Sequence, residues 1–222
     1  MSKLVWDASG ERFYENGVDH GVFYPQKADG TYDTGIAWNG LTGFTESPDG
    51  AEPTDLWADN IKYATLRSAE NFGGTLEAYT YPPEFSECDG SAVVAPGVYA
   101  GQQARKPFGF CYRTNIGSDT VEAGRHYKLH IVYNATASPS EKSYETVNDS
   151  PDAITLSWDI DTTPVNVTGY KPVSTLVIDS READPDKLDD LLDVLYGTNA
   201  EGSSEGTAPT LPLPDTIIGM LD

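Results

Sequence analysis

Two histidines four residues apart, His126 and His130, are the pair whose spacing first suggests chemistry. On a helix, that spacing places two imidazoles on one face, where they can bind zinc. Here they alternate with Lys128 in a run of period two, which is typical of a strand, and a lysine is a poor neighbour for a metal ion. The pattern therefore favours the polar face of a strand over a metal site.

Acidic residues are numerous enough to supply a catalytic or a calcium-binding set. The chain has 35 Asp and Glu, so pairs at the separation that a glycosidase needs arise by chance. Four aspartates carry side chains that can bind calcium, although their spacing matches no EF-hand loop: Asp29, Asp33, Asp159 and Asp161. The sequence contains no P-loop, dinucleotide fingerprint, G-x-S-x-G or HExxH motif. We therefore expect solvated acidic side chains, no cofactor, no metal and no enzymatic activity.

Net charge narrows the range of partners. Against 35 acidic residues the chain has 14 Lys and Arg, giving a net charge of -21 over 222 residues. Such a field repels phosphates, so sequence-specific DNA binding is not expected, whereas passive contact with DNA is compatible with it. No apolar run approaches the roughly 20 residues that span a bilayer, so no membrane insertion is expected.

The two cysteines, Cys88 and Cys111, belong to no CxxC or Cys/His motif, and the opening MSKLVWDASG lacks the apolar core of a signal peptide. Buried free thiols in a protein made in the cytoplasm are the expectation, with a disulfide as the alternative.

Three runs of alternating apolar and polar residues predict the strands that position these side chains: Pro107–Arg113, His126–Tyr133 and Ala153–Ile160. Because strand side chains alternate with period two, each run predicts a strand with one buried and one wetted face, and together an antiparallel sheet. Further strands are expected as a hairpin of 20–24 with 34–41, a hairpin of 62–67 with 75–81, and the runs 165–170 and 173–179. The fold class is therefore mainly β.

One α-helix is well specified over 184–196. Asp184 suits the N-cap, Pro185 the first turn, and Gly197 the C-terminal stop. Four leucines recur at helical spacing: Leu188, Leu191, Leu192 and Leu195. After this expected domain of residues 1–197, the segment 198–210 has the composition of a flexible linker, and 211–222 is an apolar tail that docks on its own body or on a neighbour.

Long segments without a strand pattern are expected to project, above all the loop 43–59 and the open segment 91–104. A loop of that length is usually functional or ordered by a partner. Trp38 and Trp57 border the first loop and are candidates to face a partner, whereas Trp158 is assigned to the core.

Several motifs follow one another along the chain: AWNGLT at 37–42, SPDGAEPT at 47–54, ADNIKY at 58–63, EAYTYP at 77–82, FCYRT at 110–114, NDSP at 148–151 and LPLPD at 211–215. Together they resemble the major tail proteins of long-tailed bacteriophages and prophages of Gram-positive bacteria. None of them carries chemistry, and the resemblance lies in their number and order over nearly the whole chain.

This resemblance implies a tail-tube-type β-sandwich with a flanking α-helix and long extended loops, assembled as stacked, hexameric rings. The rings would form a tube around the tape measure protein, closed by tail terminator and tip proteins, as part of a virion assembled in the bacterial host cytoplasm. It also implies that a long loop reaches the next ring. The loop 43–59 is our candidate, with these expected contact residues: Trp38, Pro48, Asp49, Glu52, Asp55 and Trp57.

Two other functions compete with a self-assembling tube. A carbohydrate-binding or receptor-binding β-sandwich of a virion would also explain the aromatic residues and loops, and predicts a discrete monomer or trimer with affinity for glycans. A β-sandwich hydrolase requires two carboxylates in one cleft and measurable turnover.

Overall fold

The computed structural model describes residues 3–120, 125–144, 146, 152–200 and 205–222. Within these residues, eight antiparallel strands form the main sheet in the order β2-β1-β11-β12-β13-β8-β3, and β14 pairs with β12 as well. Their bounds are β1 Phe13–Pro25, β2 Ile36–Ala37, β3 Leu41–Glu46, β8 Gly73–Ala78, β11 Phe108–Ser118, β12 His126–Ala137, β13 Leu156–Thr162 and β14 Thr175–Asp179. The mainly β, antiparallel fold predicted from the alternating runs is confirmed.

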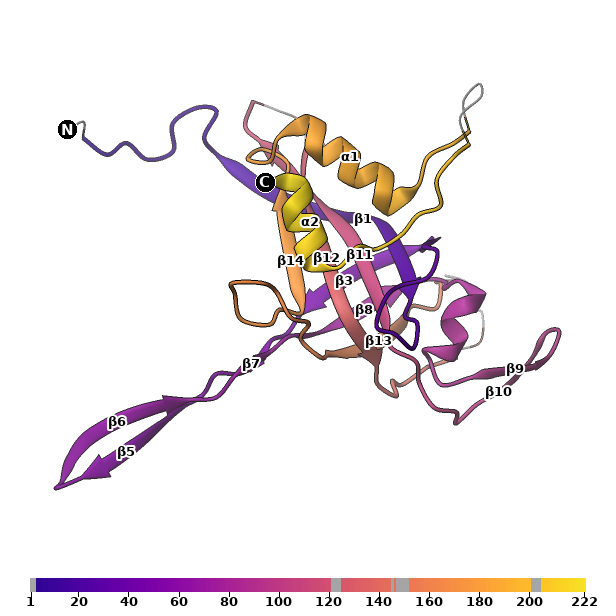
Figure 1. Ribbon diagram of the computed structural model, residues 1–222, viewed down its shortest axis with the longest axis horizontal. Coiled ribbons are helices and arrows are strands. Elements are labelled where there is room, and N and C mark those ends of the chain that lie inside the picture. The colour runs from indigo at the N-terminus through magenta and orange to yellow at the C-terminus, as the bar shows by residue number, and fades with distance from the viewer. Residues whose placement is uncertain (1–2, 121–124, 145, 147–151, 201–204) are drawn as a thin grey trace.

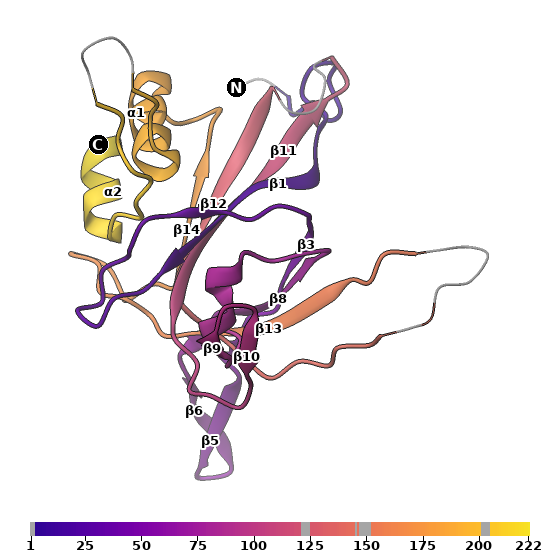
Figure 2. The same ribbon diagram turned by 90° about the vertical axis from the view of Figure 1, so that its right-hand side faces the viewer.

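Smaller elements surround this sheet, as Figures 1 and 2 show. Three two-stranded ladders pair β4 (Asp49–Gly50) with β7 (Glu70–Asn71), β5 (Pro53–Ala58) with β6 (Ile61–Arg67), and β9 (Ala92–Ala95) with β10 (Val98–Ala100). The helices are a 3₁₀ turn at Pro83–Glu87, α1 at Pro185–Tyr196 and α2 at Pro214–Leu221. None of the helices in the described part of the chain is long and apolar enough to span a membrane.

The sheet is buried on both faces at its centre, whereas the sequence predicted one wetted face. One face of β11 contributes Phe108, Phe110 and Tyr112 to a core that also holds Trp158 of β13. The opposite face of β12 contributes Leu129, Ile131 and Tyr133 to a second core under α1 and α2. The alternation was therefore predicted correctly. The second face of these strands is in contact with water only where neither β8 nor a helix covers it.

A bulge at Asn134 changes which alternate positions of β12 face which core: Tyr133 belongs to the core under the helices, and Ala135 to the other core. Phe108 pairs with Ala135 and Phe110 with Val132, so β12 carries one extra residue there. Asn134 has φ 47°, a left-handed conformation that asparagine tolerates better than most residues. Its side chain donates to the Thr163 carbonyl at 3.1 Å. Past this point the strand bends and pairs with β13 instead of β14.

Helix α1 follows the predicted signals closely. Asp184 caps it by accepting from the backbone N–H groups of Asp186 and Lys187, and Gly197 ends it with φ 75°. Three of the four leucines are buried and Leu192 is partly buried. The apolar tail forms α2, a second helix that the sequence did not predict, and it packs on the same core through Ile217 of the same chain.

The segment expected to be a linker is attached to the body where it is described. The Gly35 N–H donates to the Pro209 carbonyl at 2.8 Å, and the Thr210 N–H donates to the Val194 carbonyl at 2.8 Å. These bonds attach the chain to the body where it passes from α1 to α2 (Figure 1).

Several strand pairings differ from the prediction. The hairpin of 20–24 with 34–41 is confirmed in part, because β2 pairs with Val22 and Phe23 of β1. The hairpin of 62–67 with 75–81 is wrong: β6 pairs with β5, and β8 pairs with β13 and β3. The run 165–170 makes only an isolated bridge, between Val165 and Val173.

Two segments expected to be loops contain strands. The range 43–59 includes most of β3 and all of β4 and β5, and 91–104 contains the β9–β10 hairpin. Both hairpins are exposed, so the side-chain pattern lacked the buried positions from which strands are recognised. Local turns and the hydrogen bonds between the paired strands form these hairpins instead.

Candidate functional site

Two strand edges are open in the part of the sheet that β1, β11, β12 and β14 form. From Phe13 to Asp19, β1 pairs with β11 alone, because β2 joins it only further along. On the other side of β12, the strand β14 pairs with β12 and with no other strand of the described chain. The four strands β1, β11, β12 and β14 therefore form a half-sheet with an unpaired strand at each side.

Hydrogen bonding identifies which groups of β14 point outward. The Tyr133 N–H donates to the Ser174 carbonyl, and the Ser180 N–H donates to the Tyr127 carbonyl. In an antiparallel ladder, every second residue bonds to the same neighbouring strand. The even-numbered residues of β14 therefore bond to β12, and the N–H and C=O of Val177 point away from β12. An exposed edge of this kind is a template for pairing with another strand.

The half-sheet has one helix-covered and one helix-free face. By register, Glu15, Thr114, Lys128 and Asp179 share the helix-free face. Lys128 pairs with Glu15, and Arg181 pairs with Asp179 at 2.6 Å. Hydrogen bonds from Arg181 hold the pKa of Asp179 below its usual range. The cations on this face are thus neutralised by neighbouring carboxylates.

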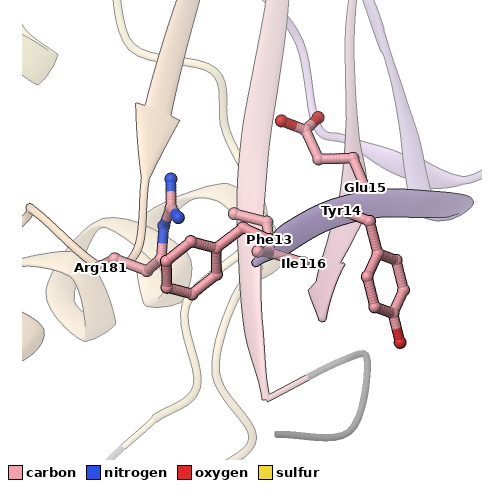
Figure 3. Close-up of a pocket in the computed structure, with 5 residues that line it drawn as sticks. All are labelled: Phe13, Tyr14, Glu15, Ile116 and Arg181. Carbon is pink, nitrogen blue, oxygen red and sulfur yellow. The ribbon is translucent and has the colours of Figure 1, made fainter. Parts of the chain in front are cut away.

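A small pocket lies at one end of the helix-free face (Figure 3). It is lined by Phe13, Tyr14, Glu15, Ile116 and Arg181 and has a volume of about 190 Å³. The Arg181 guanidinium carbon lies 4.8 Å from the centre of the Phe13 ring. This contact places the start of β1 and the end of β14 at the same end of the sheet.

A hairpin projects from the opposite end of the molecule (Figure 1). The β4–β7 ladder is its stalk, and β5–β6 is its tip; each residue of the tip except Ala64 is exposed. By register, Leu56, Ala64 and Leu66 share one face, while Asp55 accepts from Thr65 at 2.9 Å on the other. The tip therefore presents an apolar stripe opposite a hydrogen-bonded polar face.

The predicted contact residues divide between this hairpin and the core. Pro48, Asp49 and Glu52 lie along the stalk, and Asp55 and Trp57 lie in the tip, where Trp57 is 68% exposed. These five residues are brought together on one projection. Their role in a contact between rings stays a prediction.

Trp38 does not belong to this set. Its side chain is 3% exposed and packs 4.6 Å from the ring of Phe85, centre to centre. Its indole N–H donates to the Thr80 carbonyl at 2.9 Å. The expectation that Trp38 faces a partner is therefore wrong, because its ring is enclosed and its polar atom is satisfied within the chain.

Sequence reasoning predicted the second strand of the hairpin, as 62–67, but missed the first strand, β5, and its pairing with β6. Ile61, Tyr63 and Leu66 are large, apolar and exposed. The signal that could have identified the hairpin is the dipeptide Asp59-Asn60. Its φ values of 51° and 62° form the tight turn of a two-residue hairpin loop.

The residues considered for metal binding do not form a metal site in the described part of the chain. Among the described residues, no group of His, Cys, Asp or Glu is arranged to hold a metal ion. His130 stacks on Tyr112 at 4.6 Å, and burial lowers its pKa. Its Nδ1 lies 3.5 Å from a Glu46 carboxylate oxygen without forming a hydrogen bond. The imidazole is thus held as a neutral, packed ring.

Both cysteines are free and buried, as expected. Burial raises the pKa of the Cys88 thiol to about 12, and that of Cys111 likewise to about 12. A thiol with so high a pKa is almost entirely protonated at neutral pH and is a poor nucleophile. These side chains pack in the core.

Comparison with known proteins assigns no family to this chain. No family model matches the sequence, and no curated protein matches it. Among solved structures, the chain is similar to one in the cryo-EM structure of the anti-feeding prophage (AFP) baseplate, 6-fold symmetrised, with 9% sequence identity, coverage of 79% of this chain and 97% of that chain, and a TM-score of 0.37. That score is too low to assign a fold or a function from the neighbour.

Proposed function

We propose that this protein is a structural virion protein whose copies assemble into stacked rings, six to a ring, and form the tail tube of a bacteriophage. The proposal rests on the sequence motifs that resemble major tail proteins and, above all, on the two open edges of the four-stranded half-sheet. A tape measure protein inside the tube, and terminator and tip proteins at its ends, are the partners that the resemblance implies.

Strand direction allows the edges to meet. Because β1, β11, β12 and β14 alternate in direction, β14 runs opposite to β1. When β1 of one copy is placed beside β14 of the next, the antiparallel ladder continues without a break. Each such contact repeats with the same hand, so the contacts close into a ring when the rotation per copy permits it.

The covered face determines which side lies inward. Helices α1 and α2 occupy one face of the half-sheet and add a layer there, so a closed ring places them outside (Figure 2). The helix-free face, with its paired charges, then lines the tube. Free Lys or Arg on such a surface would hold DNA through counterion release, so neutralised cations favour passage of the genome.

The projecting hairpin serves contact between rings. A two-stranded hairpin is marginally stable by itself in water, and this one buries almost none of its tip against the body. Its apolar stripe would be buried on a neighbouring ring, while Asp55 and Trp57 are the expected contact residues of the other face of the tip.

The test is electron microscopy of the purified protein together with two variants at one position of β14. Val177→Pro removes an outward N–H without touching the ladder to β12, since proline is tolerated on an edge strand. Val177→Ala keeps that N–H and is the matched control. We expect rings or tubes for the natural protein and for V177A, and folded monomers for V177P.

Other outcomes would overturn the proposal. Rings formed equally by V177P would exclude edge pairing through β14. A natural protein that stays monomeric at every concentration and binds glycans would instead identify the receptor-binding alternative.

A further inference from the structure

The first described residues form an apolar segment that lies outside the body. Leu4, Val5 and Trp6 are 73%, 74% and 75% exposed, and Figure 1 shows this end of the chain running away from β1. The base of the segment is held by described hydrogen bonds: the Gly10 N–H donates to the Asp119 carboxylate at 3.0 Å, and the Arg12 guanidinium donates to the Asp7 carbonyl at 2.7 Å. Three consecutive large apolar side chains in water gain nothing unless they bind something.

An apolar groove lies at the opposite edge of the half-sheet, between β14 and α2. Its volume is about 340 Å³, and the residues that form it include Leu176, Ile178, Ile217, Ile218, Leu221 and Asp222. Ile218 is partly exposed and Val177, which also lines the groove, is more than half exposed. The groove flanks the strand edge that carries the outward groups.

We propose that this groove binds Leu4, Val5 and Trp6 of a second copy of the chain. The inference rests on the proposed function, because it takes the pairing of β1 with β14 of the next copy as its starting point. That pairing would place the neighbour's Phe13 beside the Asp179 end of β14, by the same antiparallel geometry that brings Arg181 over Phe13 within one copy.

The segment has the turn and the length that this binding requires. The Glu11 N–H donates to the Ala8 carbonyl, and Gly10 has φ 88°, so the chain changes direction just before β1. The seven residues 3–9 span at most about 25 Å when extended, at about 3.3–3.6 Å per residue. The five residues of β14 span about 17 Å by the same rule, so the segment can lie along the whole groove.

The chemistry of the groove favours the same occupant. Its described lining contains no cation and is apolar apart from Asp222, so it suits three apolar side chains. The groove is also continuous with the edge at which the second copy would pair.

Cysteine cross-linking between differently tagged chains tests the inference. One chain carries Trp6→Cys and the other Ile218→Cys; the natural cysteines are buried and stay unreactive. The two are mixed as monomers, allowed to assemble and then oxidised. A disulfide requires Cα atoms within about 7 Å, so a cross-linked dimer containing both tags is the expected result. The control replaces Ile218→Cys with Tyr170→Cys, which is more exposed (75% against 39%) but outside the groove, and should give no such dimer.

The outcomes separate this inference from the proposed function. Tubes that form without the W6C–I218C dimer would overturn the inference and leave the tube protein intact. A chain carrying both substitutions that cross-links within itself would show that the groove binds its own segment, which also overturns it. Failure of the unmodified protein to assemble would overturn the proposed function, and this inference with it. As a second measurement, Trp6→Ser should leave the thermal unfolding of the monomer unchanged and reduce assembly at least tenfold.

Discussion

The body of the sheet and the projecting hairpin use the same residue types in opposite ways. In the body, the rings of Trp38, Phe85 and Trp158 pack with centres 4.6–5.5 Å apart, and Trp158 is fully buried. In the hairpin, Trp57 and Tyr63 are mostly exposed, and the two strands contact little besides each other. The body is held together by its own packing, whereas the apolar residues of the hairpin stabilise nothing until a partner covers them.

Substitution at the centre of the body should have the largest effect on folding. Trp158→Ala removes a fully buried indole and its hydrogen bond to Asp89. We expect a loss of about 3–5 kcal/mol in the free energy of unfolding, measured by urea denaturation. A loss below about 1 kcal/mol would show that this core collapses around the cavity and contributes less than its packing indicates.

A smaller effect is expected at the start of α1, which covers the body from outside. Asp184→Ala removes the oxygen that accepts from the Asp186 and Lys187 N–H groups at 3.0 and 3.3 Å. The expected loss is about 1 kcal/mol in urea unfolding. Asp190→Ala, on the exposed side of the same helix, is the matched control and should change stability by less than about 0.5 kcal/mol.

Acidification should weaken the body through His130. Burial lowers the pKa of this imidazole from its ordinary 6.5, despite the nearby carboxylates of Glu46 and Glu15, while Lys128 acts in the same direction as burial. The unfolded chain therefore binds a proton more readily than the folded chain, and stability falls as pH drops below about 6.5. Thermal melts between pH 7.5 and 5.5 should show this loss.

His130→Gln should flatten that dependence, because it removes the group whose pKa burial lowers. An unchanged pH dependence in the His130 variant would assign the loss of stability to other groups.

The smallest effect on folding is expected in the hairpin. Trp57→Ala should change the free energy of unfolding of the monomer by less than about 0.5 kcal/mol, because the side chain is exposed. It should nevertheless reduce the assembly of rings into tubes, measured by sedimentation and electron microscopy. Tyr170→Ala, at a comparably exposed aromatic residue outside the hairpin, is the control. Destabilisation of the monomer by W57A, or unaffected tubes, would remove the distinction between the two regions.

Local signals predicted part of this molecule well. The capping aspartate, the proline and the leucine spacing determined α1, and alternation determined the strands β11, β12 and β13 and the faces of their apolar side chains. In these elements the governing interactions lie within a few residues along the chain. The expected contact residues came instead from the resemblance to tail proteins: Asp55 and Trp57 lie on an exposed projection, and their contact with a partner stays a prediction.

The tertiary structure alone decided which strands pair and which faces are covered. Trp38 was misplaced because what encloses it, Phe85 and the Thr80 carbonyl, lies more than 40 residues away along the chain. Gly109 likewise lies under Leu211, where an added Cβ would be only 2.3 Å from a leucine methyl carbon, and no pattern around Gly109 indicates that neighbour. A strand's own residues determine its alternation, but the edges left open depend on every other strand that competes for them.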